Sequence, residues 1–153
     1  MNKEELKYRI KNLVPESEVL DDKNFLTFTV AKESFFQLCT SLKEDKDLAF
    51  DYLFNLSGVD WESKLMVVYH LRSTKHNHEI VVKTSTNDRE NPEIDSICGL
   101  WKTAEFLERE VYDFFGIKFT NHPDLRRLFL DETRIEGFPF RKDYKDEINI
   151  IER

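Results

Sequence analysis

Two histidines placed two positions apart are the first residues in this sequence that could do chemistry. His76 and His78 flank Asn77, and residues two apart on a β-strand share a face, so their imidazoles could bind one metal ion. No third or fourth ligand stands at a diagnostic spacing, and the stretch is polar and as long as a hairpin connection. We therefore interpret both histidines as exposed loop residues. An alternative is a free-standing metal hydrolase, whose ligands would be His70, His76, His78 and His122.

Cysteine and glycine usage argues against a cofactor held by this chain. The two cysteines, Cys39 and Cys98, are too few for a disulfide framework or for a zinc site built from cysteine pairs. An iron–sulfur cluster commonly takes four thiolates. The four glycines are scattered, so neither a dinucleotide-binding fingerprint nor a phosphate-binding loop is present. We expect two free thiols, no metal and no bound cofactor.

Length and charge narrow the class of partner. The 153 residues are the length of one domain, and the net charge of −7 opposes phosphate, so nucleic acid is not the expected main partner. The longest mainly apolar stretch, residues 65–69, is far too short to cross a hydrocarbon core of about 30 Å. The first five residues lead into no apolar segment of a secretory signal. Any membrane association is expected to come through a partner.

The elements that must position these residues can be placed from hydrophobic periodicity. Helical spacing predicts helices over 4–13, 31–43 and 101–115, the last ended by Gly116, and a short helical turn containing Ile94, Ile97 and Cys98. Strands are predicted over 26–30, 50–59, 65–72 and 79–85. Hairpin-length connections between the last three give an α+β two-layer domain: a mainly antiparallel sheet backed by helices. We assign residues 1–116 to this core domain and 117–153 to an extended C-terminal arm of the same domain.

Charged residues gather at the end of the chain. Glu105, Arg109 and Asp113 stand four apart on the predicted helix, where salt bridges along one face are feasible, although such a face often simply meets water. Residues 117–153 show little sustained periodicity, and residues 137–144 alternate aromatic and charged side chains around a proline. Arginines and aromatics on a segment without its own core are typical of a protein–protein anchor. We interpret this tail as an arm that completes its fold on another subunit.

Two motifs in this region resemble a known family. The first is Glu108-Arg109-Glu110, Asp113, two aromatics and Gly116-Ile117, followed by His122-Pro123-Asp124-Leu125-Arg126-Arg127-Leu128; the second is Gly137-Phe138-Pro139-Phe140-Arg141-Lys142-Asp143-Tyr144. In this order they are similar to the motifs of the 30 kDa subunit family of respiratory complex I, also called the C subunit of NADH-quinone oxidoreductase. The match is close from about Trp101 to Tyr144. Phe140 stands where the family usually has leucine, a hydrophobic exchange that puts little in doubt.

The resemblance implies a non-catalytic subunit in the peripheral arm of a proton-pumping NADH:quinone oxidoreductase. Such a subunit lies beside the quinone-site (49 kDa-like, D) subunit and near the B and I iron–sulfur subunits. NADH, FMN, iron–sulfur clusters and quinone then belong to the complex, which holds this chain peripherally at the cytoplasmic face of the membrane. No catalytic residue of the family maps onto this chain. Position by position, the expected contacts between subunits or within the motifs are Glu108, Arg109, Glu110, Asp113, His122, Asp124, Arg126, Arg127, Arg141, Lys142, Asp143 and Tyr144.

The same motifs also resemble the homologous small subunit of membrane-bound hydrogenases of the formate hydrogenlyase type. In those complexes the module often precedes a large-subunit domain. Neighbouring genes would separate the two: genes for NADH- and flavin-binding subunits support the first assignment, and genes for nickel-site maturation support the second.

Overall fold

A five-stranded sheet forms the centre of the molecule. The computed structural model describes residues 2–21, 24–127 and 137–143. The strands of the sheet are β1 (Glu18–Asp21), β2 (Leu26–Thr29), β3 (Tyr52–Asp60), β4 (Leu65–Ser73) and β5 (His78–Thr86). Their order is β1-β2-β5-β4-β3, with β2 and β5 parallel and the other neighbours antiparallel. The predicted α+β class, with a mainly antiparallel sheet backed by helices, is confirmed.

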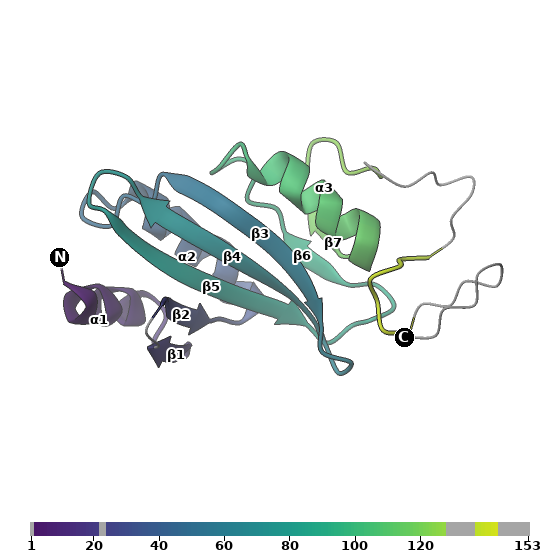
Figure 1. Cartoon of the computed structure of the whole chain (residues 1–153), viewed down its shortest axis with the longest axis horizontal. Coiled ribbons are helices and arrows are strands. Elements are labelled where there is room, and N and C mark those ends of the chain that lie inside the picture. Colours follow the sequence, from purple (N-terminus) through teal and green to yellow (C-terminus); the bar gives the residue numbers. More distant parts are fainter. Residues whose placement is uncertain (1, 22–23, 128–136, 144–153) are drawn as a thin grey trace.

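Alternation of apolar residues along the central strands buries one face of this sheet. Tyr69 and Leu71 of β4 pair with Val82 and Ile80 of β5, and all four side chains are fully buried. α2 (Lys32–Glu44) lies behind the sheet in Figure 1 and packs Phe35 against Tyr69, with ring centroids 4.6 Å apart. This layer of helix on sheet forms the main hydrophobic core.

The ends of the helices follow local rules. α1 (Lys3–Leu13) begins with a capping box in which the Asn2 side chain accepts from the Glu5 amide and the Glu5 side chain accepts from the Asn2 amide. α3 (Ala104–Phe115) ends at Gly116, as predicted, with the glycine in the left-handed conformation. In the described part of the chain no helix combines the length and apolar character that a bilayer crossing demands.

α3 connects two very short parallel strands, β6 (Glu93–Asp95) and β7 (Lys118–Thr120), which pair with each other beside the main sheet (Figure 1). Trp101 Nε1 donates to the Phe50 carbonyl and Thr103 Oγ1 to the Leu53 carbonyl, which fixes the start of α3 at one end of β3. The prediction that the short helical turn contains Ile94 is therefore wrong. Ile94 lies in β6, and the turn begins only at Ile97, whose carbonyl accepts from the amide of Trp101.

The tail begins as part of the packed core. Ile117 and Phe119 are buried, and β7 pairs with β6. The residues directly after the predicted boundary at 116 thus belong to the same packed unit as α3. An arm that completes its fold elsewhere stays a prediction for 128–136 and 144–153, which lie outside the described residues.

Candidate functional site

Glu108 is a buried carboxyl that joins α3 to the segment leading into it. Its side chain is fully buried and accepts hydrogen bonds from Ser96 Oγ (2.6 Å) and from the Ile97 amide (2.8 Å). Burial raises the pKa of Glu108 to about 7, although both hydrogen bonds favour the charged form. The carboxyl therefore holds the end of β6 against the helix from inside the protein.

The other end of α3 carries a second buried carboxyl, Asp113, which faces Arg127. The Arg127 Nε lies 3.8 Å from Asp113 Oδ1, and the two side chains are only 8% and 0% exposed. Earlier on the same helix, Arg109 Nε donates to the Arg126 carbonyl at 3.3 Å. One charge pair and one backbone contact thus fix residues 126 and 127 along the helix.

His122 is held between two backbone groups. Its Nε2 lies 3.0 Å from the Glu105 carbonyl, and its Nδ1 accepts from the Asp124 amide at 3.0 Å. A carbonyl can only accept and an amide can only donate, so the proton of the neutral ring sits on Nε2. His122 shapes the turn after β7 and has both ring nitrogens occupied.

The closing segment, which we define as residues 137–143, returns to the end of α3 through aromatic and arginine contacts. The Phe138 ring lies against Gly116 and between two guanidinium groups, with its centroid 4.8 Å from Arg127 Cζ and 5.2 Å from Arg141 Cζ. A Cβ added to Gly116 would come within 2.5 Å of the Phe138 ring. The absence of a side chain at residue 116 therefore permits this close approach.

Phe140 and Arg141 extend the contact. The Phe140 ring stacks on Phe114 at 4.1 Å, and its amide donates to the Phe114 carbonyl. The Arg141 guanidinium donates to the carbonyls of Phe115 and Arg89. The closing segment is thus bonded to the last turn of α3 and to the loop before β6.

The third anchor of the closing segment is a buried ion pair that the sequence did not reveal. Asp60, at the end of β3, accepts from both terminal nitrogens of Arg89 at 2.6 and 2.8 Å and from the Lys142 amide at 2.8 Å. The Arg89 guanidinium holds the pKa of Asp60 well below its usual range, against the opposing effect of burial. Arg89 also contacts Asp143 at 3.2 Å. Asp60 therefore connects three segments that are far apart in sequence.

The twelve candidate residues divide into an internal and a surface set. Glu108 and Asp113 have no exposed surface, and the side chains of Arg109, Arg127, Arg141 and His122 each bond to backbone carbonyls of the chain itself. For these residues the structure supplies contacts within the motifs. The exposed members are Glu110, Asp124, Arg126, Lys142 and Asp143, for which contact with a partner remains a prediction. Tyr144 lies outside the described residues.

Sequence reasoning missed Asp60 and Arg89, and it gave Phe138 no role of its own. Asp60 and Arg89 are 29 positions apart and belong to no shared local pattern. Only the sheet register, which brings the end of β3 near the loop after β5, makes them neighbours. The sequence does show many acidic and basic residues in the connections between strands, but this does not tell which of them form ion pairs.

The four histidines do not converge. His76 and His78 stack, but their Nε2 atoms bind the carbonyls of Lys46 and Leu48. His70 contacts Asn55, and His122 contacts the Glu105 carbonyl of α3. Across residues 2–21, 24–127 and 137–143, no group of three or more His, Cys, Asp or Glu side chains could hold a metal ion. The described residues thus do not assemble the metal site of the hydrolase alternative.

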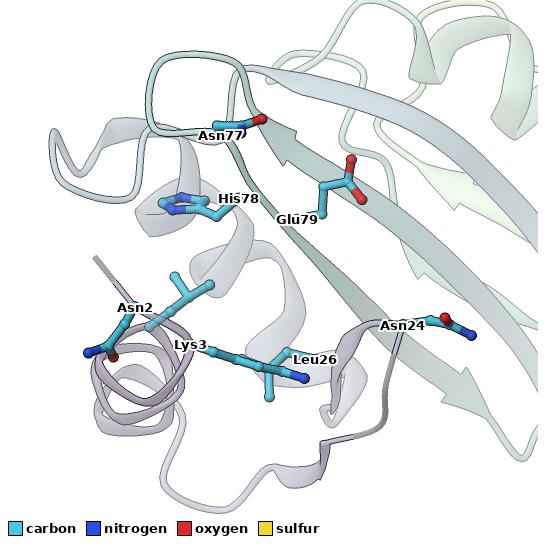
Figure 2. Close-up of a pocket in the computed structure, with 8 residues that line it drawn as sticks. Asn2, Lys3, Asn24, Leu26, Asn77, His78 and Glu79 are labelled. Atoms are coloured by element: carbon cyan, nitrogen blue, oxygen red, sulfur yellow. The ribbon is translucent and has the colours of Figure 1, made fainter.

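His78 also lines a hollow of about 410 Å³ beside the start of α1. Figure 2 shows His78 above Asn2 and Lys3 of the α1 start, with Leu26 below the centre of the hollow and Asn24 at the right. Burial lowers the pKa of His78, and its Nε2 is bonded to a carbonyl, so only Nδ1 is left to act as an acceptor. None of the described residues that line this hollow is a serine, threonine or cysteine.

Known proteins are similar to this chain over most of its length, including the two motifs. A family model described as "Respiratory-chain NADH dehydrogenase, 30 Kd subunit" matches residues 28–148. The chain is 46% identical over 121 residues to the C/D subunit of the NADH-quinone oxidoreductase of Phocaeicola vulgatus, a match that covers 78% of this chain and 23% of that protein. It is 42% identical over 122 residues to the C subunit of the Paramagnetospirillum magneticum enzyme, covering 78% and 60%. The chain therefore spans between about a quarter and three fifths of the length of these relatives.

The fold has a counterpart among solved structures. A chain in the membrane-bound sulfane sulfur reductase, an archaeal respiratory membrane complex, superimposes with a TM-score of 0.80 and 25% sequence identity. The match covers 95% of this chain and 86% of that one. A fold that matches 95% of this chain thus recurs in a respiratory membrane complex.

Proposed function

The chain belongs to the 30 kDa subunit family of respiratory-chain NADH dehydrogenase, and from that premise we propose that it is a non-catalytic structural subunit of an NADH:quinone oxidoreductase. Its role is to hold neighbouring subunits in place within the peripheral arm. The complex oxidises NADH, reduces quinone and moves protons, and the isolated chain is inactive.

One observation carries the proposal: the internal set of polar side chains in the family motifs stabilises the fold of the chain itself. Glu108 and Asp113 bind a loop and an arginine inside the protein, and Arg141 binds two backbone carbonyls. Groups used in this way give a rigid shape, which is what a positioning subunit requires. The exposed charges that flank this network are then available for partners.

The expected partners are the quinone-site D subunit and the B and I iron–sulfur subunits. The C/D name of the Phocaeicola vulgatus relative, of which this chain matches 23%, supports association with D in particular. NADH, FMN, the iron–sulfur clusters and quinone are bound by other subunits of the complex. The chain reaches the cytoplasmic face of the membrane through them.

Affinity purification of the chain from its native host, followed by mass spectrometry and an NADH:quinone assay, tests this function. We expect the B, D and I subunits to accompany the chain, and activity to follow the complex and be absent from the chain purified alone. A chain that is recovered alone under mild conditions, or that oxidises NADH by itself, would refute the proposal.

A second candidate is the equivalent position in a related respiratory complex with another electron donor or acceptor, including the membrane-bound hydrogenases. The observation that favours it is the close match to a chain of a sulfane sulfur reductase complex. The same purification separates the two, because NADH- and flavin-binding subunits accompany the chain only in the first case.

A further inference from the structure

Trp61 is an exposed aromatic side chain on a hairpin that is rigid before any partner arrives. It lies in the connection between β3 and β4, and 54% of its surface is exposed. Its ring is oriented by a contact from Nε1 to Met66 Sδ (3.4 Å), and its backbone is bonded to that of Lys64. Tryptophan is usually well covered in folded proteins and is enriched among the residues that dominate binding.

The turn around Trp61 is fixed by the same carboxyl that holds the closing segment. Asp60 Oδ1 accepts from the Glu62 amide at 2.8 Å, and Glu62 adopts a positive φ of 68°, which a non-glycine residue seldom does. Asp60 Oδ2 at the same time accepts from the Lys142 amide. Preorganisation of this kind lowers the entropy lost on binding.

A hollow of about 530 Å³ lies next to this turn, lined by Glu62, Arg89, Lys142 and Asp143. It is built from the hairpin, from the loop after β5 and from the closing segment, which Figure 1 shows in yellow beside the end of β3. Charges of both signs line it, paired as Lys142 with Glu62 (3.7 Å) and Arg89 with Asp143 (3.2 Å). An exposed aromatic ring beside a hollow lined by charged residues has the form of an anchor with a charged rim.

We propose that Trp61 and this hollow form the docking site for the D subunit, a statement that rests on the proposed function above. The Trp61 ring would contact an apolar side chain of D. One of the two ion pairs around the hollow would open, and its charged group would bind a polar group of D.

The choice of D follows from the position of the closing segment in the chain. The family match ends at residue 148, five residues after Asp143, and five extended residues reach at most about 18 Å. In the relatives named C/D, the name puts C before D, and this chain matches only 23% of the Phocaeicola vulgatus protein. A D part that follows the C part in the order of the name therefore begins near Trp61.

Site-specific cross-linking in the native complex tests this assignment. Trp61→p-benzoylphenylalanine is introduced into the full chain, the complex is purified and irradiated, and the products are identified by mass spectrometry. The same replacement at Tyr8, an exposed aromatic on α1 at the other end of the molecule, reports background cross-linking. We expect cross-links from position 61 to D; cross-links to another subunit, or none, would overturn the proposal.

Titration of the purified chain with D supplies the affinity. Trp61→Ala should weaken binding by at least about tenfold, as is typical for a dominant aromatic anchor, while Tyr8→Ala binds as the unaltered chain does. Equal binding by both variants would overturn the docking site and leave the scaffold function standing. If the unaltered chain bound neither D nor any other subunit, the proposed function itself would fail.

Discussion

Glu108 is a carboxyl that the fold keeps out of water while requiring it to accept two hydrogen bonds. Its pKa is raised from 4.5 to about 7, so between these values the folded chain retains a proton that the unfolded chain loses. The contribution of this group to stability is fully present below pH 4.5 and is lost as the pH rises through 7, with a size on the order of 3 kcal/mol. The unfolding free energy should therefore fall between pH 4.5 and pH 7 by the contribution of this one buried side chain.

Glu108→Gln should remove this pH dependence. Because glutamine has nearly the same shape and cannot ionise, the unfolding free energy of the variant should rise relative to that of the unaltered protein between pH 5 and pH 8. Urea denaturation at several pH values measures the difference. Glu110→Gln, on the exposed side of the same helix, is the matched control, and parallel pH profiles for all three proteins would contradict the assignment.

Gly116→Ala should destabilise the protein by roughly 1–2 kcal/mol, because residue 116 has φ +76° and an alanine there pays the steric cost of the left-handed conformation. The new methyl group would also push on Phe138, which lies within 2.5 Å of the Cβ position. Gly99→Ala is the control, since nothing lies within 4 Å of its Cβ position. Equal unfolding free energies of the two variants in urea would show that Phe138 and the backbone adapt without strain.

At the scale of the elements, the sequence predicted the three helices and strands β2 to β5, and all were found. It missed β1, which is no shorter than β2 but lacks a regular apolar alternation, and it missed β6 and β7. β6 and β7 have three residues each, which is less than two periods of alternation, and they exist because α3 brings them side by side. The parallel pairing of β2 with β5 joins residues more than fifty positions apart and is likewise set by tertiary packing.

The closing segment depends on the ion pair between Asp60 and Arg89, so Asp60→Ala should release it. The variant loses two charged hydrogen bonds and leaves Arg89 half-buried without its main partner, an expected loss of about 2–3 kcal/mol. Trypsin at pH 8 should then cut faster after Arg141 and Lys142. Because the pKa of Asp60 is lowered, its contribution is present above pH 4 and is lost as the pH falls below its ordinary value.

Asp143→Ala is the control for this experiment. Asp143 also contacts Arg89, but its side chain is 60% exposed, and exposed pairs of this kind contribute at most about 1 kcal/mol. Trypsin cleavage rates that match in the two variants would mean that Asp60 does not hold the segment.

At the scale of the whole molecule, the sequence could not sort the candidate residues into internal and exposed ones. Arg126 and Arg127 are neighbours of the same type, and an interface role was predicted for both. In the structure the Arg126 side chain is exposed and bonds to the nearby Asp124, whereas Arg127 faces the buried Asp113. Which of two adjacent arginines points inwards is decided by the path of the backbone along α3, which no local pattern encodes.

Charge reversal at these two positions should therefore have opposite consequences. Arg127→Glu places a second carboxylate beside the buried Asp113, so we expect a loss of about 3–5 kcal/mol in the unfolding free energy of the isolated chain. Arg126→Glu changes an exposed side chain and should alter that free energy by no more than about 0.5 kcal/mol, yet weaken capture of the other peripheral-arm subunits. Chemical denaturation of each variant, beside its recovery with those subunits, separates the two effects. A charge that contacts a partner can be reversed without harm to the fold, and a charge that stabilises the fold cannot. A stable Arg127→Glu protein would therefore mean that Arg127 does not stabilise the fold. An Arg126→Glu chain that assembles normally would mean that Arg126 does not contact a partner.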